Sequence, residues 1–184
     1  MKKRCEWAKD EPNTTYHDDE WGVPLHDDVG LFEFLILEGA QAGLSWRTIL
    51  NRRDGYRIAF SNFDVVAVSK YTQNHVKKLL QNKDIIRNKL KINSAINNAK
   101  QFIKIQQEFG SFDEYLWGFV NHKPIKNKFK KHSDLPCSST ISEKLSQDLK
   151  KHGFTFVGPI ICYSLMQAVG MVNDHTSDCY KYLK

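Results

Sequence analysis

The chain lacks features that would place it in a membrane or outside the cell. No apolar run is long enough to cross a bilayer, and the start, MKKRCEWAKDEP, lacks the apolar block of a signal peptide. Only four cysteines occur among 184 residues, too few for a disulfide-rich secreted scaffold. No repeat, linker or shift of composition divides the chain. The sequence therefore predicts one domain, residues 1–184, in the cytoplasm, with its cysteines reduced.

The chain also lacks any sustained alternation of apolar and polar residues, the pattern typical of a β-strand. Instead, glycine and capping residues recur at helix-sized intervals. Apolar residues at three- and four-residue steps predict a helix over residues 89–108. Capping boxes at Ser111 and Thr140 predict two more helices, and a short helix from Ser45 is expected to end near Gly55. The predicted fold class is all-α.

The stretch from Val29 to Trp46, VGLFEFLILEGAQAGLSW, has no polar face over residues 31–37, so it predicts a helix buried in the core. Gly43 and then a new N-cap predict where this helix ends. Glu38 is the one carboxylate near its far end. A buried carboxylate must be paired, hydrogen-bonded or neutral, since burying the bare charge costs several kcal/mol. Glu38 is therefore either a structural group or a group that recognises a ligand.

The net charge of +6 favours a polyanionic partner, with nucleic acid preferred over a membrane because no basic amphipathic anchor is present. The alternative is a basic protein with no such partner. The lysine-rich segment 121–132 reads as a loop that either contacts phosphate or is solvated and flexible.

Near the C-terminus, Gly153 is expected to end one helix and Pro159 to begin another, IICYSLMQAVG. The two helices would form a hairpin that ends in Val157, Gly158 and Pro159. Backbone N–H groups at such a turn can bind phosphate without reading sequence. On its own, the pair could equally be a packing motif.

Two histidines and two cysteines near the chain ends suggest a metal site. His175 and Cys179 are spaced H-x3-C, and Cys5 with His17 would complete a Cys2His2 set, the ligands of a structural zinc ion. Four protein ligands leave no position for a reactive water, which argues against a zinc hydrolase. The alternative is two buried cysteines and two ordinary histidines.

Residues 1–28 look irregular and are rich in aromatic side chains. Tyr16 lies beside the candidate ligand His17, and Trp46 closes the buried stretch. Two aromatic rings and the carboxylate of Glu38 could clamp a planar base, with stacking from the rings and a hydrogen bond to the edge of the base. Alternatively, Tyr16, Trp21 and Trp46 are core aromatics.

Four motifs, YHDDEWGVP, LEGAQAGLSW, GFVNHKP and GFTFVGPIICYSLMQAVGMVNDH, closely resemble those of the 3-methyladenine DNA glycosylase I family. The resemblance runs from Cys5 to Cys179. It implies a helix-hairpin-helix glycosylase fold, with two helical lobes around a base pocket. It also implies that the terminal segments 1–28 and 171–184 are joined by one structural zinc ion.

The resemblance implies a role for each matched residue. Asp174, the acidic residue nearest the position of the wider superfamily's catalytic aspartate, is not expected to act in that way. The implied zinc ligands are Cys5, His17, His175 and Cys179; the implied base-binding residues are Glu38, Tyr16, Trp46 and Trp7, with Glu38 also catalytic; and the implied DNA contacts are Gly43, Leu44, Val157, Gly158 and Ile160, within the loop at 43–44 and the hairpin Phe156–Ile160.

The implied activity is base-excision repair. A monomer would flip 3-methyladenine out of double-stranded DNA and hydrolyse its N-glycosidic bond, leaving an abasic site. The competing hypothesis is a zinc-stabilised helical module that binds DNA without catalysis. That module explains the charge, the hairpin and the metal ligands equally well, but it does not explain a carboxylate and an aromatic ring at the two ends of a small-residue segment.

Overall fold

The computed structural model describes residues 2–183, which form ten α-helices and one two-residue parallel ladder. The prediction of an all-α fold is confirmed. No helix among these residues is both long and apolar enough to span a bilayer. The α-helices are α1 (Asn13–Asp19), α2 (Asp28–Gln41), α3 (Trp46–Leu50), α4 (Arg53–Ala59), α5 (Val65–Ser69), α6 (Gln73–Gln81), α7 (Lys89–Phe109), α8 (Phe112–Gly118), α9 (Thr140–Lys151) and α10 (Pro159–Ala168).

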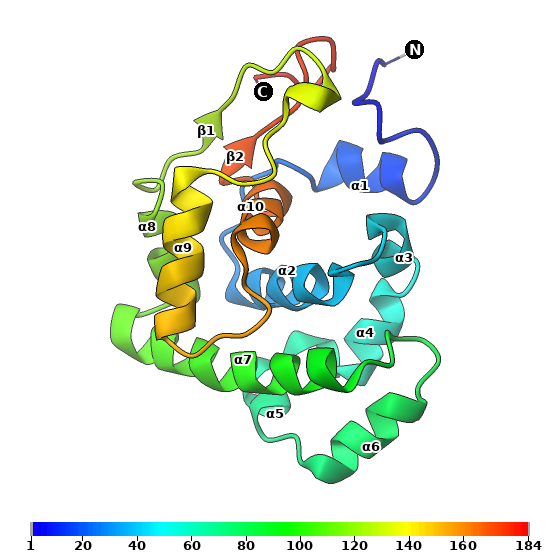
Figure 1. The fold of residues 1–184 in the computed structure, drawn as a ribbon, viewed down its shortest axis with the longest axis vertical. Coiled ribbons are helices and arrows are strands. Elements are labelled where there is room, and N and C mark those ends of the chain that lie inside the picture. Colours follow the sequence, from blue (N-terminus) through cyan, green and yellow to red (C-terminus); the bar gives the residue numbers. More distant parts are fainter. Residues whose placement is uncertain (1, 184) are drawn as a thin grey trace.

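Helix α2 lies at the centre of the molecule (Figure 1). It contacts α3, α7, α8 and α10, and ten of its fourteen residues are buried. Asp27 caps its start by accepting a hydrogen bond from the Gly30 N–H at 2.8 Å. Gly43, at φ +78°, follows its end, and Ser45 caps α3 by accepting from the Thr48 N–H. The predicted buried helix and the predicted position of its end are confirmed.

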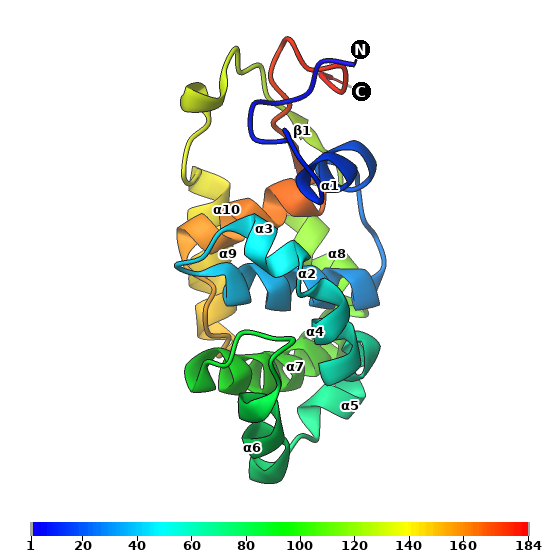
Figure 2. The same cartoon turned by 90° about the vertical axis from the view of Figure 1, so that its right-hand side faces the viewer.

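The N-terminal and C-terminal segments both lie at one end of the molecule, and α6 lies at the other (Figures 1 and 2). The Tyr180 N–H donates to the Lys3 carbonyl at 2.9 Å, and the Lys3 ammonium pairs with Asp178 at 2.8 Å. Strands β1 (Ile125–Lys126) and β2 (Val172–Asn173) pair in parallel, with Ile125 opposite Val172. This ladder fastens the start of the 121–139 connection to the C-terminal segment.

Three local predictions were wrong. Residues 13–19 form helix α1 although they carry no apolar periodicity and no side-chain cap, because burial of Tyr16 and His17 stabilises it. Gly55 lies inside α4, where the Asp84 carbonyl occupies the place of a Cβ. The cap of α9 is Ser139, one residue before the predicted Thr140.

Helix α7 supports both segments that were predicted to contact DNA. The Lys91 ammonium donates to the carbonyls of Ala40 at 2.8 Å and Ala42 at 2.6 Å, so it caps the end of α2 just before Gly43. Two turns further along α7, the Asn98 side chain exchanges hydrogen bonds with the Thr155 backbone at 2.9 Å each. The loop at 43–44 and the hairpin between α9 and α10 therefore rest on one rigid element.

Candidate active site

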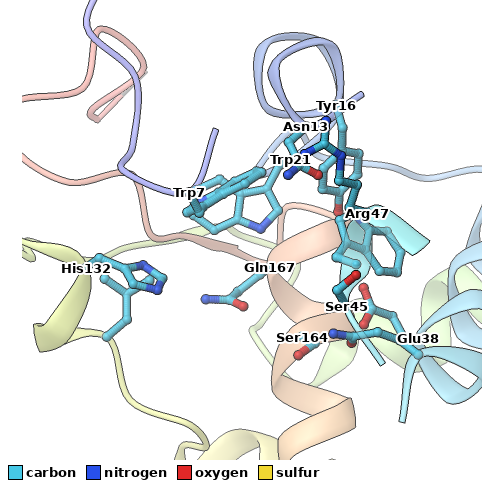
Figure 3. Close-up of a pocket in the computed structure, with 13 residues that line it drawn as sticks. Trp7, Asn13, Tyr16, Trp21, Glu38, Ser45, Arg47, His132, Ser164 and Gln167 are labelled. Atoms are coloured by element: carbon cyan, nitrogen blue, oxygen red, sulfur yellow. The ribbon is translucent and has the colours of Figure 1, made fainter. Parts of the chain in front are cut away.

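A cavity of about 410 Å³ opens between α1, the start of α3 and one face of α10, with Glu38 of α2 in its wall (Figure 3). Its volume falls in the range of small-ligand sites. The aromatic lining comes from two parts of the chain that are distant in sequence. Its lining residues are Trp7, Asn13, Tyr16, Trp21, Glu38, Gln41, Ser45, Trp46, Arg47, His132, Leu135, Ser164 and Gln167.

Glu38 is the buried carboxyl of this pocket, with 3% of its surface exposed. No hydrogen bond or ion pair joins its carboxyl group to another of residues 2–183. Burial alone raises its pKa to about 8, because the charged form loses hydration without gaining a partner. Of the two interpretations of Glu38, a structural group or a group that recognises a ligand, the structural one has no partner for the carboxyl among residues 2–183. Glu38 is therefore an unpaired carboxyl that lines a cavity large enough for a small ligand.

Aromatic rings surround the space that Glu38 faces. The Tyr16 and Trp46 rings lie 5.3 Å apart between centroids and are tilted by 51°. Trp7 contacts Tyr16 at 6.1 Å and Trp21 edge-on at 5.0 Å. Burial raises the pKa of the Tyr16 hydroxyl well above its usual value, and the charge of Glu38 adds to that shift, so Tyr16 stays protonated as a hydrogen-bond donor.

An ion-pair network fixes the position of Tyr16 relative to Glu38. The Arg53 guanidinium, on α4, pairs with Glu20 after α1 at 2.7 Å and with Glu33 of α2 at 2.6 Å. Burial opposes the charge on Arg53, but these two carboxylates raise its pKa overall. Helix α1 is thus tied to α2 through α4. The missed helix α1 is the element that positions Tyr16 and His17.

Beside the pocket, four side chains converge on one point. The ligand atoms of Cys5, His17, His175 and Cys179 all lie within 4.8 Å of one another, and all four residues are buried. The Cys179 sulfur lies 3.4 Å from His17 Nε2 and 3.5 Å from His175 Nδ1. The Cys5 sulfur lies 3.6 Å from His175 Nδ1. In a tetrahedron with zinc–sulfur bonds of about 2.3 Å and zinc–nitrogen bonds of about 2.0 Å, the sulfur–nitrogen edge is about 3.6 Å.

The second nitrogen of each histidine supports a metal site. His17 Nδ1 lies 2.8 Å from the Asp18 carboxylate, and His175 Nε2 lies 3.1 Å from the Trp21 carbonyl. A proton on each of those nitrogens leaves the nitrogen that faces the sulfurs unprotonated, as a metal requires. Burial raises the pKa of Cys5 to about 11 and lowers that of His175 to about 4. This buried Cys2His2 group could hold a metal ion.

The predicted DNA contacts lie on the surface beside the pocket. Leu44 is 38% exposed and Ile160 is 61% exposed. A Cβ added at Gly43 or Gly158 would meet no atom within 4 Å, so both backbones are open to a partner. Val157 is 1% exposed as a whole residue, and its carbonyl accepts from the Ser146 hydroxyl at 2.6 Å, so it lies beneath this surface. His132, the last residue of segment 121–132, lines the pocket.

Comparison with known proteins now decides the family. The methyladenine glycosylase family profile matches residues 7–182. The chain belongs to this family. It is 45% identical over 181 residues to DNA-3-methyladenine glycosylase 1 of Escherichia coli K12, covering 98% of this chain and 97% of that protein.

Solved structures of the family agree with the fold. The 3-methyladenine DNA glycosylase I of Staphylococcus aureus, solved to explain 3-methyladenine recognition, is 36% identical with a TM-score of 0.95, over 98% of this chain and 97% of that one. A Tyr-to-Phe variant of a 3-methyladenine DNA glycosylase I, solved in complex with 3-methyladenine, is 35% identical with a TM-score of 0.95, over 98% of each chain. The resemblance drawn from the motifs is confirmed.

In this methyladenine glycosylase, the structure brings the predicted base-binding residues into one pocket. Sequence reasoning missed several other lining residues, above all Ser164 and Gln167. A signal for these two existed, because they are polar residues three apart in an otherwise apolar helix. Asp174 does not line the pocket. Its carboxylate accepts hydrogen bonds from Tyr163, Gln167 and Asn127, which leaves it structurally engaged.

Proposed function

We propose that this chain excises 3-methyladenine from alkylated double-stranded DNA by hydrolysing the N-glycosidic bond, which leaves an abasic site for base-excision repair. Membership of the methyladenine glycosylase family and the names of its relatives support this function. The observation that carries it at the level of the site is the unpaired, buried carboxyl of Glu38 among aromatic rings. The catalytic unit is a monomer that comprises the whole chain.

The charge of the substrate explains why such a carboxyl is useful. Methylation at N3 makes adenine a cation while it is attached to the sugar. With a pKa of about 8, Glu38 is mostly neutral in the empty pocket at pH 7. A cationic base beside it lowers that pKa, so the carboxyl ionises as the lesion docks and forms a weakly screened ion pair. Neutral adenine gains no such ion pair, which gives the enzyme its preference.

The cationic base is already a good leaving group, so little general-acid help is needed. The enzyme flips the nucleotide out of the duplex, and the base stacks on Trp46 while Tyr16 and Glu38 contact its polar edge. When the glycosidic bond breaks, its electron pair moves to the base and cancels the base's charge, and the sugar becomes an oxocarbenium ion. Water then adds at the sugar carbon and releases a proton. Glu38 acts by electrostatics and hydrogen bonding rather than by abstracting a proton.

The exposed loop and hairpin would hold the DNA. Leu44 enters the space that the flipped base vacates, and the open backbone at Gly43 allows the loop to approach the stack. The backbone N–H of Gly158 in the hairpin contacts phosphate, with exposed Ile160 beside it and buried Val157 supporting the turn from below.

We assign the Cys2His2 group to one structural zinc ion, held by Cys5, His17, His175 and Cys179. The ion would join the terminal segments 1–28 and 171–184, and so hold α1 and Trp7 against the pocket. Zinc supplies no chemistry to the reaction here, since four protein ligands close its coordination sphere.

Release of bases from alkylated DNA tests this function directly. Wild-type protein should liberate 3-methyladenine, identified by chromatography. Glu38→Gln should lower the rate by about 10²-fold or more, because glutamine keeps the shape but cannot form the ion pair. Glu143→Gln, an exposed carboxyl on α9, is the matched control and should excise at the wild-type rate.

Two outcomes would contradict the proposal. Wild-type protein that binds alkylated DNA but releases no base is a binding module rather than a glycosylase. If Glu38→Gln protein excises 3-methyladenine at the wild-type rate, Glu38 has no role in the reaction.

A further inference from the structure

The backbone that carries Leu44 forms a tight turn of defined type. In the turn of residues 41–44, the Leu44 N–H donates to the Gln41 carbonyl at 2.7 Å. The two central residues have the dihedral angles of a type II β-turn, with φ −43° and ψ 116° at Ala42 and φ +78° at Gly43. Glycine adopts a positive φ without strain, as the third position of this turn requires. The turn therefore sets the direction in which Leu44 leaves the end of α2.

The Lys91 ammonium, on α7, holds the central peptide of this turn from the inner side. It donates to the Ala42 carbonyl at 2.6 Å and to the Ala40 carbonyl at 2.8 Å. No carboxylate among residues 2–183 pairs with it, and burial lowers its pKa. The charge of Lys91 is thus used for two charge-assisted hydrogen bonds to backbone carbonyls, which turn the Ala42 carbonyl toward α7.

The direction of that carbonyl decides where the next N–H points. The C=O and N–H of a trans peptide point in opposite directions, so the Gly43 N–H faces away from Lys91. Gly43 is exposed, and no acceptor among the described residues, 2–183, bonds to its N–H. A type I turn differs by rotation of this one peptide, which would turn the N–H inward and the carbonyl outward. Because glycine permits both forms, the Lys91 ammonium selects between them.

The face of α7 that carries Lys91 also supports the hairpin between α9 and α10. Helix α7 contacts α2 and runs alongside it (Figure 1). Asn98 lies seven residues after Lys91, on the same face, and donates to the Thr155 carbonyl at 2.9 Å. Phe156 of the hairpin packs on Gly39 of α2, where an added Cβ would lie 3.4 Å from the Phe156 Cβ. The turn and the hairpin are therefore fixed relative to each other.

We propose that Lys91 is a positioning residue for base flipping. By holding the Ala42 carbonyl inward, it presents the Gly43 N–H outward to the DNA backbone and fixes the approach of Leu44 to the base stack. Phosphate oxygens of DNA commonly accept hydrogen bonds from backbone N–H groups of a protein. Lys91 acts through the turn and touches no substrate. This inference rests on the proposed function and assigns the residue that orients its 43–44 loop.

Lys91→Met tests this role, because methionine keeps the aliphatic stem and removes the ammonium. The kcat/KM for release of 3-methyladenine from alkylated duplex DNA should fall by about tenfold, the effect of losing a charge-assisted hydrogen bond. Affinity for free 3-methyladenine, measured by quenching of tryptophan fluorescence, should stay at the wild-type value, since the free base enters the pocket without flipping. Lys89→Met, an exposed lysine at the start of α7, removes the same charge and is the matched control.

Three results with these variants would overturn the inference. Excision by Lys91→Met at the wild-type rate would mean that the ammonium has no role in positioning the turn. An equal fall in Lys89→Met would mean that only the lost positive charge matters. A parallel loss of affinity for the free base would mean that Lys91→Met disturbs the pocket rather than the turn.

The Gly43 amide gives a second measurement that needs only wild-type protein. Hydrogen exchange followed by NMR should show this amide unprotected in the free protein and protected in the complex with a duplex that contains a tetrahydrofuran abasic analogue. An amide that is protected in the free protein, or unprotected in the complex, overturns the outward N–H. If Lys91→Met does not fold, this exchange measurement decides. Wild-type protein that binds the duplex but releases no 3-methyladenine overturns the proposed function instead.

Discussion

Replacing Glu38 with glutamine should make the fold more stable than wild type, and increasingly so as the pH rises from 5 to 8. The carboxyl is 3% exposed, and its pKa is raised by burial from 4.5 to about 8. Between these two values, the folded protein keeps a proton on Glu38 that the unfolded chain releases. Native stability therefore falls as the pH rises through this window, because ionisation favours the unfolded state.

The size of the effect follows from the pKa difference. Each pKa unit corresponds to 1.36 kcal/mol, so a rise from 4.5 to about 8 is equivalent to about 5 kcal/mol of stability. That is a large share of the 5–15 kcal/mol typical of a domain. Glutamine fills nearly the same space and cannot ionise, so Glu38→Gln should not lose folding stability through this group as the pH rises. The gain relative to wild type should be smallest near pH 4 and level off above pH 8.

Urea unfolding followed by circular dichroism, at each pH from 5 to 9, gives the free energy of unfolding of both proteins. Titration of other groups and of the metal ligands is common to both and cancels in the difference. Glu143→Gln, at an exposed position, should show no comparable trend. A difference between Glu38→Gln and wild type that stays constant across the range would refute the reasoning, since the carboxyl would then be hydrated in the folded pocket.

Two further predictions concern the metal group and the DNA surface. Cys179→Ala should abolish zinc binding, measured by atomic absorption. It should also lower the free energy of unfolding by several kcal/mol, because metal binding is coupled to folding. Full zinc content with unchanged stability in this variant would exclude the assigned site. Ile160→Glu should weaken binding to duplex DNA about tenfold, by fluorescence anisotropy, since it sets a carboxylate against phosphate. Ile58→Glu, at an 82% exposed position on α4, is its control, and equal affinity in the two variants would remove the hairpin from the DNA interface.

Local sequence signals were sufficient where a structure is built within one or two helical turns. The apolar run of α2, the cap at Ser45 and the proline that begins α10 each predict an element boundary that the structure contains. The same signals failed for α1, whose seven residues have neither cap nor periodicity. That helix exists because Tyr16 and His17 are buried against distant parts of the chain.

The functional site likewise has features that the sequence predicts and features that only the folded structure shows. Residue types and family motifs identified Glu38, the aromatic rings and the four candidate metal ligands from the sequence. The sequence could not give the pKa of Glu38, because that value depends on the lack of any partner within the folded pocket. It also could not show that Asp174 holds Gln167, or that His132 lines the cavity.

The sequence by itself thus determined most of the helical elements, the family and the chemical groups available for recognition of a base. Only the tertiary structure decided which of those groups are unpaired, which are fixed in orientation and which face the same space. The physical reason is that helix signals act between residues three or four apart, whereas hydration and hydrogen bonding at the pocket depend on segments that are more than a hundred residues apart and meet only in the folded protein.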